Sequence, residues 1–249
     1  MLLRASKWIN PGLRLHAADL IGLPLRSCGD HCGALQYQLK TIRTHGRAWP
    51  YAVWSPPGDV AAPLPVILFL HGAGERGSDG QAPTQVGLGP ALWRFPHLYP
   101  AHVVMPQCPI GSQWSGPAER VALHALDATI AQRSGDERRI YVTGVSMGGH
   151  GALRLAAHHP SRFAAVVAIC GWADTNETAP RLKGVPVWLF HGASDPVVPA
   201  RCSVELATAL RSAGARSVRH TEYPEIGHEC WDRAYADAQL SEWIFRHSR

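Results

Sequence analysis

The sequence predicts an α/β fold, in which helices cover both faces of a mostly parallel sheet. Short apolar runs without polar alternation are typical of strands buried on both faces of such a sheet. Segments with helical spacing separate these runs, so that strand and helix alternate along the chain. The predicted strands lie at 65–72, 101–107, 138–144, 163–170, 185–192 and 217–224, and the predicted helices at 119–133, 147–159, 200–214 and 230–247.

The first part of the chain departs from this alternation. Residues 1–34 show no clear periodicity, and we interpret them as an N-terminal arm. Residues 34–43 and 49–58 have the character of two strands in an antiparallel hairpin. Because a chain of 249 residues is within the usual size of one α/β domain, we expect a single domain over 35–249.

Composition places the chain among globular proteins. Apolar residues make up 46% and charged residues 17% of it, and no apolar run approaches the ~20 residues that span a bilayer. The net charge is +5, but the arginines stand mostly singly, whereas nucleic-acid surfaces cluster them among aromatic residues. We expect neither nucleic acid nor membrane as a partner, and the oligomeric state stays open. The first residues do not form a convincing secretory signal, so a cytoplasmic location is expected.

The six cysteines do not indicate a metal site. Cys28 and Cys32 form a close pair, but a zinc site needs a second pair of ligands at matching spacing, and the sequence lacks one. A local disulfide and two free thiols both stay open for this pair. We expect no metal ion and no organic cofactor.

Ser146 is the residue with the most unusual surroundings. It lies between the predicted strand 138–144 and the predicted helix 147–159, with glycine at positions 144, 148, 149 and 151. Glycine costs about 1 kcal/mol in a helix interior relative to alanine, so these glycines indicate a need for backbone freedom or close packing. A serine on a tight strand-to-helix turn also lies beside the free N–H groups of the helix start.

A serine nucleophile needs a base, and the base needs a carboxylate that orients it. Asp195 follows the predicted strand 185–192, and His228 lies in the loop before the last predicted helix. Ser146, His228 and Asp195 are therefore the candidates for a catalytic triad, an assignment that depends on the resemblance described below.

Other residues compete for these roles. Asp174 follows an earlier strand and is the rival acid. His71 and His191 each end a strand in a His-Gly-Ala segment, and we interpret both as structural residues that hold loops by hydrogen bonds.

Residues 144–148, Gly-Val-Ser-Met-Gly, resemble the nucleophile elbow of the α/β-hydrolases, and the order serine, aspartate, histidine is also theirs. The stretches FLHGAGERGSDG, VVMPQCPIGSQW and GHECWDRAY resemble the small serine carboxylesterases of that superfamily, which include phospholipase/carboxylesterase, feruloyl-esterase-like and peptidase-related members. The resemblance covers roughly residues 37–249. It implies an α/β-hydrolase fold, and the short link at 171–184 implies that no large cap domain is present.

The same resemblance implies an oxyanion hole made of backbone N–H groups. Met147 is expected to supply one donor and Ala73 the other, with Gly74 as the next candidate. Three of the nine tryptophans, Trp114, Trp172 and Trp231, fall in or beside loops at the expected active-site end. We expect these three to line a substrate pocket, and packing in the core is the alternative.

We therefore expect hydrolysis of a small-molecule ester with a short- to medium-chain acyl or aryl group, through an acyl-enzyme. A thioesterase would use the same machinery, so the sequence leaves that alternative open. A peptidase of the prolyl-oligopeptidase type usually carries an added domain, for which this chain is short. A catalytically silent binding module would usually lack a triad residue, and none is missing here. The natural substrate stays open.

Overall fold

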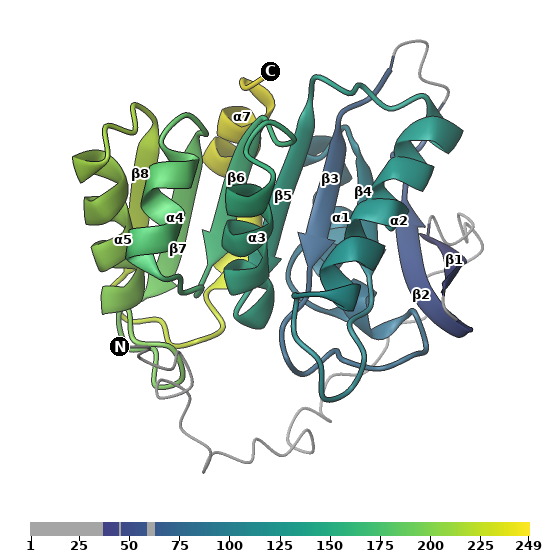
Figure 1. Ribbon diagram of the computed structural model, residues 1–249, viewed down its shortest axis with the longest axis horizontal. Coiled ribbons are helices and arrows are strands. Elements are labelled where there is room, and N and C mark those ends of the chain that lie inside the picture. The colour runs from purple at the N-terminus through teal and green to yellow at the C-terminus, as the bar shows by residue number, and fades with distance from the viewer. Residues whose placement is uncertain (1–36, 45, 59–62) are drawn as a thin grey trace.

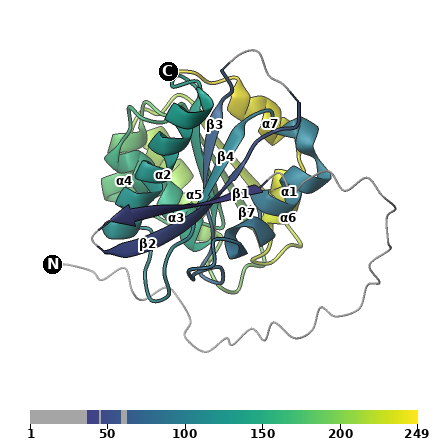
Figure 2. The ribbon, with the colours of Figure 1, turned by 90° about the vertical axis from the view of Figure 1, so that its right-hand side faces the viewer.

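The structure is a computed structural model that describes residues 37–44, 46–58 and 63–249; the expected arm at 1–34, with Cys28 and Cys32, lies outside these residues. Helices cover both faces of an eight-stranded sheet with the order β1-β2-β4-β3-β5-β6-β7-β8 (Figures 1 and 2). The strands are β1 (Tyr37–Thr44), β2 (Arg47–Trp54), β3 (Val66–Leu70), β4 (His102–Pro106), β5 (Ile140–Val145), β6 (Ala165–Ile169), β7 (Val187–Gly192) and β8 (Val218–Tyr223). The pairings of β1 with β2 and of β2 with β4 are antiparallel, and the others are parallel. The predicted fold class is thus confirmed.

The helices are distributed over the two faces of the sheet. The α-helices are α1 (Leu88–Arg94), α2 (Pro117–Arg133), α3 (Met147–His158), α4 (Thr175–Leu182), α5 (Arg201–Ser212), α6 (Trp231–Tyr235) and α7 (Ala238–Phe245), and the 3-10 helices are η2 (Ala82–Gln85) and η3 (Pro96–Leu98). Helices α2, α3, α4 and α5 cover one face, and α1, α6 and α7 cover the other (Figure 2). The short link between β6 and β7 holds only α4, and no large cap domain is evident in the described chain.

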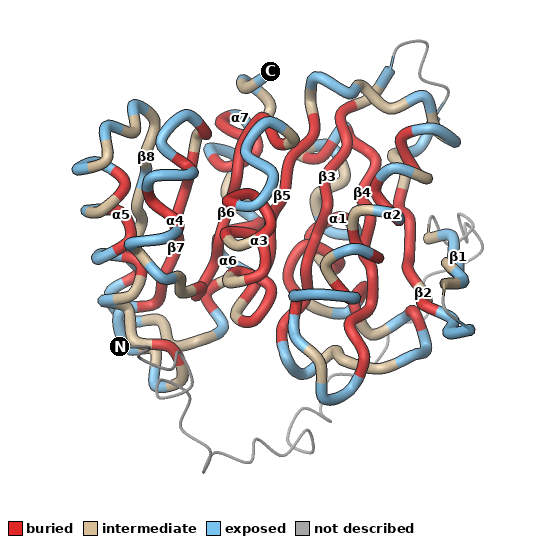
Figure 3. Tube along the Cα trace, viewed as in Figure 1, coloured by how far each residue is buried: buried red, intermediate tan, exposed pale blue. Residues whose placement is uncertain are grey.

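The strands in the middle of the sheet are buried on both faces (Figure 3). Along β3, Leu68 and Leu70 belong to the apolar cluster under α2–α5, whereas Ile67 and Phe69 belong to the cluster on the other face. This alternation follows from the two-residue period of a strand, and it explains why the sequence shows a continuous apolar run.

The end of the chain differs from the single helix predicted over 230–247. Two helices, α6 and α7, are separated at Ala236 and Asp237. Asp237 has extended backbone angles (φ −81°, ψ 114°), and its carboxylate accepts a hydrogen bond from the N–H of Gln239. A side chain that caps a helix start competes with continuation of the preceding helix, so the apolar spacing did not reveal the break.

The parallel strands place their carboxyl ends at one edge of the sheet, the lower edge in Figure 1. The residues that directly follow β3, β5 and β7 therefore meet at this edge. Among the described helices, none combines the length and the apolar character that crossing a membrane requires.

Candidate active site

Ser146 occupies a strained turn between β5 and α3. Its backbone angles are φ 53° and ψ −118°, a region that residues with a side chain rarely adopt. The turn is tight enough to exclude side chains around it: a Cβ on Gly144 would lie 2.3 Å from the Gly148 oxygen, and one on Gly148 would lie 1.8 Å from the Leu70 oxygen. The glycine requirement predicted from the sequence is therefore steric.

Ser146, His228 and Asp195 form a continuous chain of hydrogen bonds. His228 Nε2 lies 2.9 Å from Ser146 Oγ, and His228 Nδ1 lies 2.7 Å from Asp195 Oδ2. Since an ionised carboxylate only accepts, Nδ1 carries the imidazole proton and Nε2 is free to accept from the serine hydroxyl. The structure thus brings together the three residues predicted for the triad, at the distances that proton transfer needs.

The carboxylate of Asp195 is buried and receives several donors. The backbone N–H groups of Val197 and Val198 donate to its Oδ1 at 2.8 and 2.9 Å. Burial alone would raise the pKa of Asp195, but hydrogen bonds from His191, from His228 and from the Val198 N–H outweigh burial and hold this pKa well below its usual range. Asp195 is therefore an anion that can stabilise a protonated His228.

His191 is a partner of Asp195 that the sequence analysis did not connect with the site. Its Nε2 lies 2.9 Å from the Val198 carbonyl oxygen and 3.3 Å from Asp195 Oδ2. The expected structural role is present too, because Nδ1 lies 2.6 Å from the Ser203 hydroxyl. The four-residue spacing between His191 and Asp195, directly after a strand, is the sequence signal that could have indicated the contact.

The two residues expected to supply oxyanion donors belong to segments next to Ser146. Met147 is the first residue of α3, where N–H groups have no partner within the helix. The turn after β3 is next to the serine, because a Cβ on Gly72 would lie 3.7 Å from Ser146 Cβ. In the described part of the chain, no protein acceptor pairs with the N–H of Met147 or of Ala73.

The three tryptophans expected in the pocket have different surroundings. Trp231 is half-buried, and its ring lies edge-on to the imidazole of His228, with centroids 5.4 Å apart. Trp172 is also half-buried and stacks on His150 with centroids 4.8 Å apart.

Trp114 does not have the surroundings of a pocket-lining residue. It is only 3% exposed, and its indole packs edge-on against His71 with ring centroids 4.9 Å apart. A Cβ on Gly151 would lie 2.6 Å from Trp114 Cβ. Trp114 can pack against α3 because Gly151 has no side chain. It is therefore a packing residue of the core, which was the alternative to a pocket role.

Asp174, the rival acid, has a structural role. It is exposed, and its carboxylate accepts hydrogen bonds from the N–H groups of Asn176 and Glu177, at 2.9 and 3.2 Å, as the N-cap of α4. Its side chain is engaged at the helix start, while the carboxylate of Asp195 contacts His228.

Two cysteines support the loop that carries His228. Cys170 Sγ lies 2.9 Å from the His228 carbonyl oxygen and 3.0 Å from Cys230 Sγ, and both cysteines are buried. Among the described residues, one group has the proximity needed to share a metal ion, namely Cys170, Asp195 and His228. In this group Asp195 and His228 are already bound to each other, so the arrangement matches the triad better than a metal centre.

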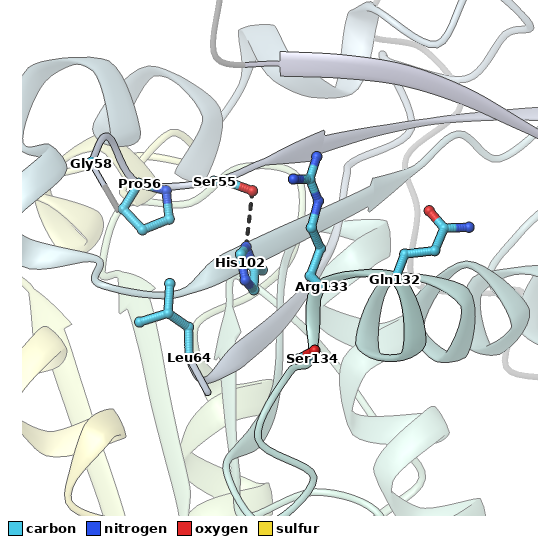
Figure 4. Close-up of a pocket in the computed structure, with 8 residues that line it drawn as sticks. All are labelled: Ser55, Pro56, Gly58, Leu64, His102, Gln132, Arg133 and Ser134. Carbon is cyan, nitrogen blue, oxygen red and sulfur yellow. Dashed lines mark hydrogen bonds between the residues drawn. The ribbon is translucent and has the colours of Figure 1, made fainter. Parts of the chain in front are cut away.

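A separate cavity of about 410 Å³ lies at the opposite edge of the sheet (Figure 4). It includes His102, the first residue of β4, and Ser134, which follows the last residue of α2. His102 begins β4, and the carboxyl end of β4 lies at the edge of the sheet that carries Ser146. The cavity is therefore remote from Ser146.

Comparisons with known proteins agree with the fold. A family model described as Phospholipase/Carboxylesterase matches residues 122–243, a range that contains Ser146, Asp195 and His228. The chain is 30% identical over 170 residues to NocK of Nocardia uniformis subsp. tsuyamanensis, a protein named as an esterase, and the match covers 62% of this chain and 47% of NocK. It is 28% identical over 208 residues to Esterase YjfP of Escherichia coli K12, covering 64% of this chain and 80% of YjfP.

Among solved structures, a thermostable esterase superposes with a TM-score of 0.77 at 30% identity, covering 86% of this chain and 64% of that one. The chain thus spans about half of NocK and less than two thirds of the thermostable esterase.

Proposed function

We propose that this chain, which belongs to the α/β-hydrolase superfamily, is a serine esterase that hydrolyses carboxylic esters. The observation that carries the proposal is the hydrogen-bonded chain from Ser146 Oγ through His228 to Asp195. The strained backbone of Ser146 supports it, because strain of this kind is retained where function requires it. The names of the relatives and of the solved thermostable esterase agree with the same chemistry.

The reaction would proceed through an acyl-enzyme. Ser146 Oγ attacks the ester carbonyl while His228 Nε2 takes the hydroxyl proton, and Asp195 stabilises the imidazolium that forms. The N–H groups of Met147 and Ala73 would bind the oxyanion, and each such donor is typically worth 10²- to 10³-fold in rate. His228 then gives its proton to the leaving alcohol, and water repeats the sequence to release the acid.

The test is a comparison of initial rates on p-nitrophenyl acetate, butyrate and octanoate. We expect Ser146→Ala to lose on the order of 10⁶-fold in turnover. Ser212→Ala is the matched control, since Ser212 is an exposed serine near the end of α5, and it should keep the wild-type rate. A fluorophosphonate probe should label the wild-type chain and the Ser212→Ala variant at Ser146, but not Ser146→Ala.

Each outcome decides the proposal. Equal activity of wild type and Ser146→Ala would show that another group carries the reaction. An inactive wild type that also resists the probe would exclude a serine esterase. Activity confined to the wild type and Ser212→Ala supports the triad, and the trend with acyl length then describes the acyl site.

A further inference from the structure

The turn that follows β3 is held by side chains at three successive carbonyl groups. Trp114 Nε1–H donates to the His71 oxygen at 2.9 Å. His71 Nδ1 lies 2.6 Å from the Gly72 oxygen, and Arg76 Nε–H donates to the Ala73 oxygen at 2.8 Å. Surface turns usually leave such carbonyl groups to water, so three side-chain donors in a row indicate that the orientation of this backbone matters.

Holding a carbonyl oxygen also sets the direction of a neighbouring N–H. A peptide unit is planar, and in its trans form the C=O and the following N–H point in opposite directions. The described chain has no cis peptide bond. The bond to the Gly72 oxygen therefore fixes the N–H of Ala73, whereas the bond to the Ala73 oxygen fixes the N–H of Gly74.

The protonation of His71 follows from its other contact. The Cys108 N–H donates to His71 Nε2 at 2.9 Å, so Nε2 carries no proton and Nδ1 must be the donor to the Gly72 oxygen. His71 has no exposed surface. Burial lowers the pKa of His71 to about 4, which keeps this tautomer neutral near pH 7.

We infer that His71 is a positioning residue for the oxyanion hole, because it holds the Gly72–Ala73 peptide unit with the Ala73 N–H directed at the reacting carbonyl of an ester bound at Ser146. This inference rests on the proposed esterase function. It assigns to the first His-Gly-Ala segment a role that differs from that of the second, where His191 contacts Asp195. His71 touches neither the substrate nor the serine in this role, and acts through the backbone alone.

Two amide substitutions separate the two contacts of His71. An asparagine amide lies where Nδ1 lies, so His71→Asn can still donate to the Gly72 oxygen. A glutamine oxygen lies where Nε2 lies, so His71→Gln can still accept from the Cys108 N–H but leaves the Gly72 oxygen without a donor. His102→Asn is the matched control, because His102 is a buried histidine in the remote cavity (Figure 4).

The readout is the ratio of kcat/KM for an ester to that for the matching thionoester, in which sulfur replaces the carbonyl oxygen. Sulfur accepts hydrogen bonds weakly, so the ratio reports on donation to the oxyanion. We expect His71→Gln to lower kcat on the ester about 10- to 100-fold with little change in KM, and to lower the ratio about tenfold. His71→Asn and His102→Asn should keep the wild-type ratio.

Three results would overturn the inference. The first is a folded His71→Gln variant that keeps the wild-type ratio. The second is a ratio lowered equally in His71→Asn and His71→Gln, which would indicate a packing role. The third is a larger loss of the ratio in Arg76→Gln than in His71→Gln, which would make Gly74 the donor. A wild type inactive on both substrates would instead remove the proposed function, and the inference with it.

A second measurement needs no variant and covers the case in which His71→Gln does not fold. A boronic acid that bonds to Ser146 Oγ places an anionic oxygen in the oxyanion hole. We expect the amide proton of Ala73 to move downfield in the NMR spectrum of this adduct, with the Nδ1 proton of His71 retained. An unmoved Ala73 amide in a formed adduct overturns the inference.

Discussion

Asp195 Oδ2 lies between two histidines, 2.7 Å from His228 Nδ1 and 3.3 Å from His191 Nε2. His228 comes from the loop after β8, whereas His191 comes from β7 itself. The carboxylate thus contacts a histidine of the sheet on one side and the imidazole of His228 on the other. Asp195 therefore connects β7 with the loop that carries His228.

Replacing Asp195 by asparagine should lower turnover on the order of 10⁴-fold, because the amide no longer fixes the tautomer of His228. The matched control is Asp174→Asn, which removes the same charge from the exposed N-cap of α4. Asparagine caps a helix nearly as well as aspartate, so this control should keep its activity and lose less than about 1 kcal/mol of stability. Steady-state kinetics on p-nitrophenyl butyrate check the pair, and a larger loss in Asp174→Asn would identify Asp174 as the acid.

The free energy of unfolding should decrease as the pH is lowered, and His71 should account for part of this decrease. Burial lowers the pKa of His71 from 6.5 to about 4. Between these pH values, His71 is mostly protonated in the unfolded chain and mostly neutral in the folded chain. Unfolding is therefore favoured progressively as pH falls from about 6.5 to about 4, by up to about 3 kcal/mol from this residue.

Urea unfolding at pH 7.5 and pH 4.5 measures this effect. Burial also lowers the pKa values of His102 and His150, which contribute in the same direction. The quantity to compare is therefore the difference in unfolding free energy between the two pH values, in the wild type and in His71→Gln. We expect the difference to be smaller in the variant, since glutamine does not titrate. An unchanged difference would mean that His71 has the same pKa in the folded and the unfolded chain.

The glycine at position 148 should not tolerate even one methyl group. A Cβ there would lie 1.8 Å from the Leu70 oxygen, and the atom it meets is backbone that cannot rotate away. We expect Gly148→Ala to lose at least about 3 kcal/mol of stability or to yield no soluble protein. Gly184→Ala is the control, because Gly184 is exposed and has nothing within 4 Å of the added carbon. Thermal unfolding of both variants checks the prediction, and similar melting temperatures would contradict it.

The buried thiol of Cys170 should be unreactive in the folded protein. The hydrogen bond with Cys230 and burial together raise the pKa of Cys170 far above its usual range. Cys202 is half-buried and is the most accessible of the four cysteines in the described chain. Treatment with iodoacetamide at pH 8 under a reductant, followed by peptide mass spectrometry, should find Cys202 alkylated before the other three cysteines of the described chain, and Cys170 only after denaturation. Early modification of Cys170 would show that the loop carrying His228 opens readily.

Local patterns were sufficient to predict the sheet and the helices α2, α3 and α5. Burial on both faces requires apolar runs at β3, β5, β6 and β7. The tight turn at Ser146 requires the glycines around it. Both requirements are visible in consecutive residues of the chain. The order of Ser146, Asp195 and His228, each beside the end of a strand, also predicted which side chains would meet. Their catalytic roles stay a prediction.

The tertiary structure alone decided how the site is supported. The contact of His191 with Asp195, the burial of Trp114 beneath the turn after β3, and the bond of His71 to the Gly72 oxygen depend on where separate segments pack. The break between α6 and α7 depends on whether the Asp237 carboxylate finds a backbone N–H, which apolar spacing does not express. The sequence by itself determined the fold class and the candidate reacting groups, since these follow from patterns along the chain. The orientation of each side chain and N–H group in the site was decided only by packing, because a hydrogen bond requires positions correct to a few tenths of an ångström.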